Sequence, residues 1–123
     1  MLLPTVSAVP ENYLVVNDDA ANRQQVEPSI AIDPLNPDVV VASAQDMRKV
    51  PEFGNRWNSY DRSVDGGRTW KNDLLPGYPT DMSPAGIASP LKQYRFTSDP
   101  LVAFDAHGNA YFAGLAVNRT SGK

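Results

Sequence analysis

The stretch "SVDGGRTW", residues 63–70, decides how this chain folds. Gly66 and Gly67 can adopt the positive φ angles that a tight turn between antiparallel strands requires. The carboxylate of Asp65 can accept hydrogen bonds from backbone N–H groups of its own turn, and Ser63 can do the same more weakly. Trp70 has the size to fill the space between neighbouring strands or sheets. The stretch therefore predicts a hairpin whose turn is held by its own side chains.

The rest of the chain predicts further strands. Eleven prolines and eight glycines interrupt the 123 residues too often for long helices. No segment keeps apolar residues at helical spacing over three turns, and the short apolar runs are rich in β-branched and aromatic residues. The sequence therefore predicts an all-β, antiparallel protein. The expected strands are 13–16, 29–33, 39–44, 56–63, 68–73, 101–105 and 110–117.

Two of the expected hairpins resemble each other. "EPSIAIDPLNPDVVVASAQD" (27–46) aligns without gaps on "DPLVAFDAHGNAYFAGLAVN" (99–118), at an offset of 72 residues. Each copy runs from an acid–proline pair through an apolar strand, an aspartate and a turn to a second apolar strand. Treating 74–98, which holds four prolines, as an insertion reduces the period to about 47 residues, the length of a propeller blade.

The pattern Ser63-x-Asp65-x-Gly67-x-Thr69-Trp70 matches the Asp-box, or BNR repeat, of the sialidase-like β-propellers. The two hairpins are similar to the inner strands of blades in that family, and the resemblance covers roughly 27–117. It implies antiparallel four-stranded blades, of which this chain would hold about one and a half. An independent small sandwich that carries one Asp-box is the alternative fold.

The resemblance also implies a domain plan. Segment 1–26 contains the strand that can close a ring, 27–73 forms the first blade, 74–98 is the proline-rich loop insertion, and 99–123 begins the second blade. The Asp-box of the family is structural and lies on the face away from the propeller mouth. The residues expected to be scaffold are therefore Ser63, Asp65, Gly67, Thr69 and Trp70.

The mouth of such a propeller would be built by the loops 45–56 and 74–98 and by the tail from Asn118. Sialidases bind the substrate carboxylate with arginines and use an aspartate as acid/base, which makes Asp46, Arg48 and Arg95 the catalytic candidates. Arg56 and Tyr94 are further mouth candidates. The Arg-Ile-Pro sequence that enters the first inner strand in the family is absent here, so these side chains can equally be exposed loop charges paired with nearby acids.

Glu27 and Asp99 precede a proline at the same repeat position. In a propeller both would face the central channel, where a ring of carboxylates can bind calcium or a polar ligand. The alternative is that each carboxylate accepts hydrogen bonds from neighbouring backbone N–H groups. No cofactor other than calcium is expected.

Charge and composition limit the partners. A formal net charge of −3 without a Lys/Arg run provides no electrostatic surface for nucleic acid, and no apolar run is long enough to span a membrane. The start "MLLPTVSAVP" is not an intact signal peptide. Three functions remain. The first is a non-catalytic extracellular or cell-surface module that binds a carbohydrate or a protein. The second is part of a sialidase-type exo-glycosidase completed by the rest of a propeller chain, and the third is a purely structural repeat in a larger extracellular protein.

Overall fold

The computed structural model describes residues 23–118 and consists mainly of antiparallel β-strands. A four-stranded sheet has the order β1-β2-β3-β4, and β5 pairs with β6 in a second sheet. This arrangement confirms the all-β prediction. The elements are β1 (Gln25–Ile32), β2 (Val40–Asp46), α1 (Val50–Phe53), β3 (Trp57–Ser63), β4 (Lys71–Leu74), α2 (Pro84–Ala88), η1 (Pro90–Gln93), β5 (Phe96–Phe104) and β6 (Ala110–Val117).

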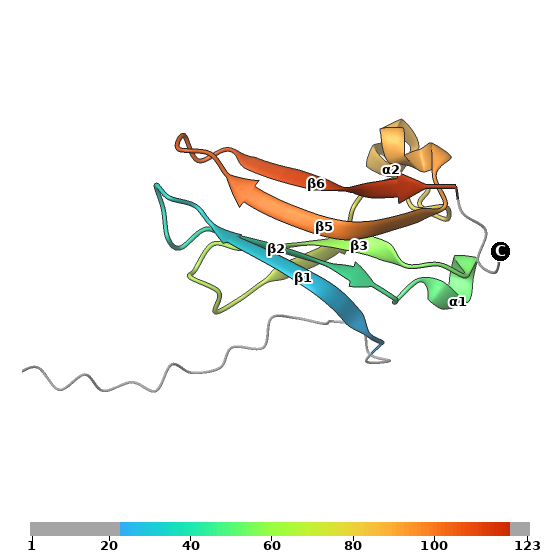
Figure 1. The fold of residues 1–123 in the computed structure, drawn as a ribbon, viewed down its shortest axis with the longest axis horizontal. Coiled ribbons are helices and arrows are strands. Elements are labelled where there is room, and N and C mark those ends of the chain that lie inside the picture. The colour runs from blue at the N-terminus through green and yellow to red at the C-terminus, as the bar shows by residue number, and fades with distance from the viewer. Residues whose placement is uncertain (1–22, 119–123) are drawn as a thin grey trace, which may run out of the picture.

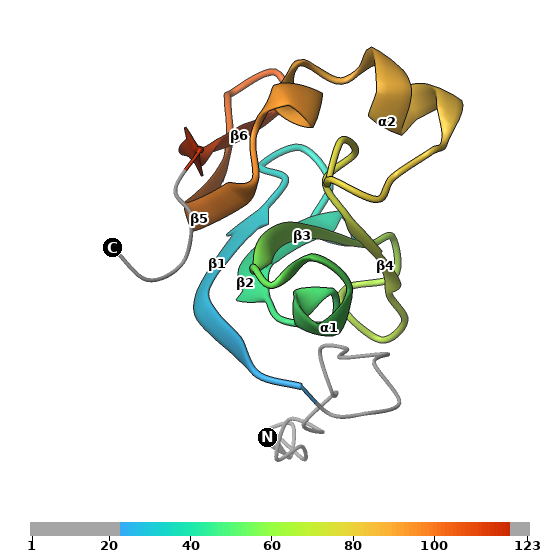
Figure 2. The same ribbon diagram turned by 90° about the vertical axis from the view of Figure 1, so that its right-hand side faces the viewer.

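The two sheets form two layers, and the two ends of this arrangement carry different elements. Figure 1 shows the β5–β6 hairpin above the four-stranded sheet, and Figure 2 shows the same separation from the side. The turns that join β1 to β2, β3 to β4 and β5 to β6 lie at one end, whereas α1 and α2 lie at the other (Figure 1). A hydrogen bond of 2.9 Å from the Gly66 amide to the Asp38 carbonyl links two of the three turns.

Polar side chains join the layers. The Asn58 amide of β3 donates to the Thr97 hydroxyl of β5 at 2.6 Å, and the Asn58 side chain donates to the Ser98 carbonyl at 3.1 Å. Gln45 of β2 donates to the Ser98 hydroxyl at 3.0 Å. The Val102 amide donates to the Ser29 hydroxyl of β1 at 3.0 Å. We call these four contacts the seam.

The two hairpins share a backbone irregularity. Each first strand has a bulge at its acid–proline pair, where Glu27 has a φ of 55° and Asp99 a φ of 48°. Such angles are uncommon for residues other than glycine and add twist to a strand. Their recurrence at equivalent positions supports the interpretation of the two hairpins as repeats.

The gapless alignment of the repeats is wrong in its second half. The Asp33 amide donates to the Val39 carbonyl, and the Asp105 amide donates to the Asn109 carbonyl, so the second turn is two residues shorter. The offset is therefore 72 residues for the first strands and 70 for the second strands. The pairs Ile32↔Val40 and Phe104↔Ala110 show the same relation.

Strand β5 also differs from its predicted bounds, because it begins at Phe96 and not at residue 101. The stretch 74–98 consequently ends inside a strand, and its remainder carries the short helices α2 and η1. The missed positions Thr97 and Ser98 are polar but buried against the other sheet, so they give no apolar alternation in the sequence. The predicted strand 13–16 lies outside the described residues.

The turn after β3 has the hydrogen bonds expected of a clamp. Asp65 accepts from the Thr69 amide at 2.8 Å, from the Thr69 hydroxyl at 2.6 Å and from the Ser63 hydroxyl at 2.8 Å. The Ser63 hydroxyl accepts from the Gly67 amide, and Trp70 donates its indole N–H to the Gly67 carbonyl. Trp70 is half-buried and not enclosed, so its removal will cost less than the roughly 3–5 kcal/mol of a fully buried tryptophan.

Hydrogen bonding to the ionised carboxylate, first from the Thr69 side chain, lowers the pKa of Asp65 from 3.8 to about 2. The carboxylate of Asp105 in the β5–β6 turn accepts from Asn109 in the same manner, and its pKa is also about 2. A carboxyl whose pKa is lowered on folding stabilises the folded state above its unfolded pKa. That contribution is lost as pH falls toward the folded pKa.

We predict that Asp65→Asn makes the melting temperature less sensitive to pH between 3.8 and about 2. The reason is that the variant has no carboxyl to protonate in that window. Thermal melts followed by circular dichroism at stepped pH measure this slope. Val64→Asn, at a 56% exposed position of the same turn, removes no carboxyl and should keep the wild-type slope. Equal slopes for Asp65→Asn and wild type would contradict the prediction.

Candidate functional site

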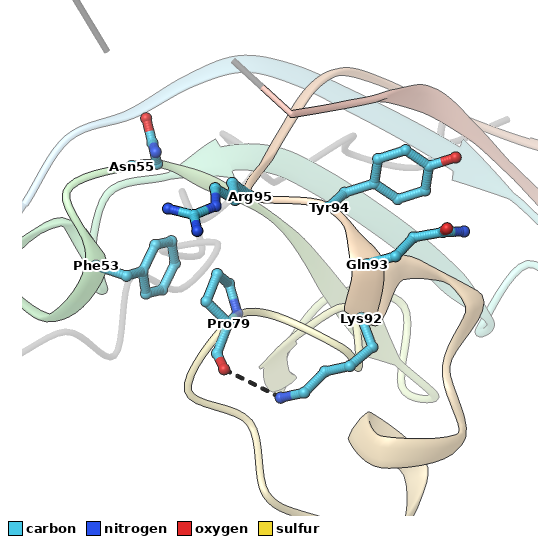
Figure 3. A pocket seen from close by; sticks show the side chains of 7 residues that line it. All are labelled: Phe53, Asn55, Pro79, Lys92, Gln93, Tyr94 and Arg95. Carbon is cyan, nitrogen blue, oxygen red and sulfur yellow. Dashed lines mark hydrogen bonds between the residues drawn. The ribbon is translucent and has the colours of Figure 1, made fainter. Parts of the chain in front are cut away.

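A pocket of about 500 Å³ lies at the end of the molecule that carries the helices. Its wall comes from the loop between β2 and β3 and from the segment that precedes β5. These are the two loops within the described residues that the sequence predicted to form a mouth. The turn between β3 and β4 lies at the opposite end (Figure 1). Figure 3 shows the lining residues: Phe53, Asn55, Pro79, Lys92, Gln93, Tyr94 and Arg95.

Contacts between α1 and the stretch 78–80 fix the two walls together. The rings of Phe53 and Tyr78 stack with centroids 6.4 Å apart, and the Thr80 hydroxyl donates to Glu52 at 2.9 Å. The Lys49 ammonium lies 5.7 Å from the Tyr78 ring centroid and 2.5 Å from the Glu52 carboxylate. Hydrogen bonds from Lys49 and then from Thr80 lower the pKa of Glu52. The pocket therefore has walls that are cross-linked by aromatic and polar contacts.

The stretch 77–92 is held together by hydrogen bonds among its own residues. The Lys92 ammonium donates to the carbonyls of Tyr78, Pro79 and Asp81, which uses all three of its protons. The Asp81 carboxylate, 5% exposed, accepts from the amides of Gly77 and Ser83 at 2.9 Å. These bonds, led by that from Gly77, lower the pKa of Asp81. Lys92 is thus a structural cation, although it lines the pocket.

Gly86 shows how little space surrounds Asp81. A Cβ atom added to Gly86 would lie 2.0 Å from Asp81 Oδ2. Any side chain at this position must therefore displace the carboxylate that holds the loop.

Arg95 is the pocket-lining residue whose charged group is available to a ligand. It is exposed, and no hydrogen bond or ion pair joins its guanidinium to another residue in 23–118. Figure 3 shows the guanidinium pointing toward the region between Phe53, Asn55 and Pro79. Its backbone is fixed, because its amide donates to the Val117 carbonyl at the end of β6. The five donors of its planar fork therefore extend into the pocket from a backbone position that is held in place.

The other mouth candidates contribute less to this pocket. Tyr94 lines it, but its ring points away from the Arg95 guanidinium (Figure 3). Arg56 is outside the lining, and its guanidinium lies over the Phe96 ring, 5.1 Å from the centroid. Such a cation–π contact favours a structural role for Arg56.

The structure brings Asp46 and Arg48 together, and neither residue lines the pocket. Asp46 is 1% exposed and accepts from the Gln25 side chain, the Arg48 amide and the Arg48 Nε at 2.7–2.8 Å. Arg48 Nη2 adds an ion pair of 2.7 Å. The carboxylate is buried and its oxygens already bond Gln25 and Arg48, so the geometry favours a structural pair over an acid/base role.

Glu27 and Asp99 occupy equivalent bulges on neighbouring first strands, and both are exposed. The Gln45 side chain donates to the Glu27 carboxylate. The Asp99 repeat has Leu115 at the position of Gln45 and lacks this donor. Among residues 23–118 no group of three or more His, Cys, Asp or Glu side chains could hold a metal ion. Calcium binding at Glu27 and Asp99 stays a prediction.

Sequence reasoning nominated Arg95 and Tyr94 but missed the rest of the pocket lining. Phe53 and Asn55 lie in a predicted mouth loop without a motif around them, and Pro79 and Lys92 lie in a stretch treated as an insertion. The one local signal was "FGN" at 53–55, where Gly54 with a φ of 77° ends α1 and lets the chain turn between the two lining residues.

We predict that Lys92→Met loosens the pocket wall without unfolding the sheets. The methionine retains the length of the side chain but leaves the Pro79 and Asp81 carbonyls without the Lys92 donor, and the Tyr78 carbonyl with only the Asp81 amide. Hydrogen exchange measured by mass spectrometry should become faster in peptides covering 77–83 and stay unchanged in those covering β2 and β3. Lys71→Met, at an exposed position of β4, is the matched control and should change neither. Unchanged exchange at 77–83 would show that Lys92 does not hold the loop.

Comparisons with known proteins give no relative for this chain: no family model matches it, and neither a curated protein nor a solved structure does. None of the helices within residues 23–118 is long and apolar enough to cross a membrane.

Proposed function

We propose that this chain is a non-catalytic ligand-binding part of an Asp-box β-propeller, and that its pocket binds a carbohydrate that carries a carboxylate. The observation that carries the proposal is the exposed guanidinium of Arg95, which has no partner within 23–118 and lies in a pocket of about 500 Å³. This volume is within the roughly 300–1,000 Å³ typical of small-molecule sites.

The chemistry of the lining suits an acidic sugar. A guanidinium can bind a carboxylate through two parallel hydrogen bonds. The half-buried ring of Phe53 offers an apolar surface for sugar C–H groups, and the Asn55 amide can both donate to and accept from hydroxyls. Figure 3 shows these two side chains on the side of the pocket toward which the guanidinium points.

The lining favours binding over hydrolysis. Glycosidases generally need two carboxyl groups flanking the scissile bond. The lining residues include no aspartate or glutamate from the described part of the chain. Asp46, the residue that the sequence suggested as the acid, accepts hydrogen bonds from the side chains of Gln25 and Arg48. We therefore prefer the binding module to the exo-glycosidase.

The wider setting of the proposal rests on the Asp-box resemblance. This wider setting is an extracellular or cell-surface location, with further blades that complete the mouth. Pocket binding itself rests on Arg95 and does not depend on that setting.

We predict that N-acetylneuraminic acid, which has a carboxylate, binds and that neutral N-acetylmannosamine binds at least about tenfold more weakly. Arg95→Ala should reduce the affinity for the acid about 10- to 100-fold, because hydrogen bonds to a charged partner contribute about 1.5–3 kcal/mol. Titration followed by NMR shifts of amides near Asn55 measures both affinities.

Arg62→Ala is the matched control, since Arg62 is an exposed arginine of β3 outside the pocket. It should bind the acid as the wild type does. Equal affinity for the two sugars, or an Arg95→Ala variant with wild-type affinity, would refute the proposal.

A further inference from the structure

Two buried side chains of the seam each carry an oxygen atom without a partner. Gln45 of β2 and Asn58 of β3 are 1% and 0% exposed. Within residues 23–118, neither the Gln45 Oε1 nor the Asn58 Oδ1 atom accepts a hydrogen bond. Buried acceptors are normally satisfied, because leaving one unpaired carries the full cost of its desolvation. The two oxygens therefore point to a ligand between the layers.

These two side chains lie next to each other. Gln45 and Asn58 are directly opposite in the register of β2 and β3, so they share a face of the sheet, with Cβ atoms about 4.5–5.5 Å apart. Both reach Ser98 on β5. Gln45 Nε2 donates to the Ser98 hydroxyl at 3.0 Å, and Asn58 Nδ2 donates to the Ser98 carbonyl at 3.1 Å. The two oxygens thus belong to amides that converge on one residue of the opposite layer.

Glu27 adds a negative charge to this group. The same Nε2 atom of Gln45 that donates to the Ser98 hydroxyl also donates to the Glu27 carboxylate. The amide oxygen of Gln45 is bonded to the same carbon as that nitrogen, so a half-turn of the amide presents the oxygen to both groups without changing its shape. In the described part of the chain, no lysine or arginine pairs with Glu27.

We propose that Glu27, Gln45, Asn58 and Ser98 bind one calcium ion between the layers, with the Gln45 amide turned so that its oxygen faces Glu27. Calcium binds carboxylates together with Asn and Gln carbonyls and waters in irregular geometry, whereas magnesium demands a near-ideal octahedron. Because the set has a single carboxylate, the dissociation constant should be weak, about 10⁻⁴–10⁻³ M. Glu27 is exposed, which gives the ion a route from solvent.

This site differs from the ring of acids that the sequence predicts. The second repeat has Asp99 at the position of Glu27 but Leu115 at the position of Gln45, so it has the carboxylate without the amide. The proposed ion therefore needs the Glu27 carboxylate and not that of Asp99. None of its four ligands lines the pocket, so the inference goes beyond the proposed function.

The test is a titration of the full chain with calcium chloride, up to about 10 mM at constant ionic strength. The side-chain NH₂ signals of Gln45 and Asn58, followed by NMR, should shift along saturable curves, and magnesium chloride should bind more weakly. Glu27→Gln removes the charge at an exposed position and should weaken calcium binding about tenfold or more. Gln45→Leu introduces the residue of the second repeat and should abolish the calcium-dependent shift of Asn58.

Asp99→Asn is the matched control, because it removes a carboxylate from the equivalent bulge of the second repeat. It should bind calcium as the wild type does. Glu27→Gln carries the test even if circular dichroism shows that Gln45→Leu loses the native strands. A wild type without a calcium-dependent shift would overturn the inference and show that water alone satisfies the two oxygens. Equal shifts with magnesium would also overturn it, as would an Asp99→Asn loss as large as that of Glu27→Gln, which a ring of acids predicts.

Discussion

The seam between the two sheets is the contact on which the rest of the arrangement depends. Thr97 and Asn58 are 2% and 0% exposed, so a polar group left unpaired there would cost about 1–3 kcal/mol. The hydrogen bonds of the seam therefore fix which face of the four-stranded sheet meets β5, and in which register. The seam also holds the start of β5, two residues after Arg95, against β3.

The two ends of the molecule are held together by different kinds of contact. At the turn end, Asp65 and Asp105 each accept several hydrogen bonds from their own turns, so the strands are closed by local contacts. At the other end, the connections are long and contain short helices, and they meet through side chains from distant parts of the sequence. Loops positioned by a rigid sheet are the usual place for binding residues. Arg95 stands where the insertion joins β5, so its position is set by the sheet.

The sequence predicted best what is local. The partners of Asp65 lie within four residues of it, and the spacing of the motif alone identifies the clamp. The seam was not predictable in this way, because Asn58 and Thr97 are 39 residues apart and both are polar residues with no pattern around them. The start of β5 was missed for the same reason. The resemblance assigned the two loops that line the pocket to one mouth. The contact between Phe53 and Tyr78 that holds these loops together joins residues far apart in the sequence, so it could not be predicted from a local pattern.

The most direct test of the repeat arrangement is the exchange of two backbone amides followed by NMR. The amides of Asn58 and Val102 donate to the side-chain hydroxyls of Thr97 and Ser29 on the opposite sheet. We predict that both amides are protected from exchange in the wild type. Thr97→Val should then speed the exchange of Asn58 much more than that of Val102, and Ser29→Ala should do the reverse. Rapid exchange of both amides in a wild type whose β1–β2 and β5–β6 hairpins remain protected would show that the sheets do not stack as described.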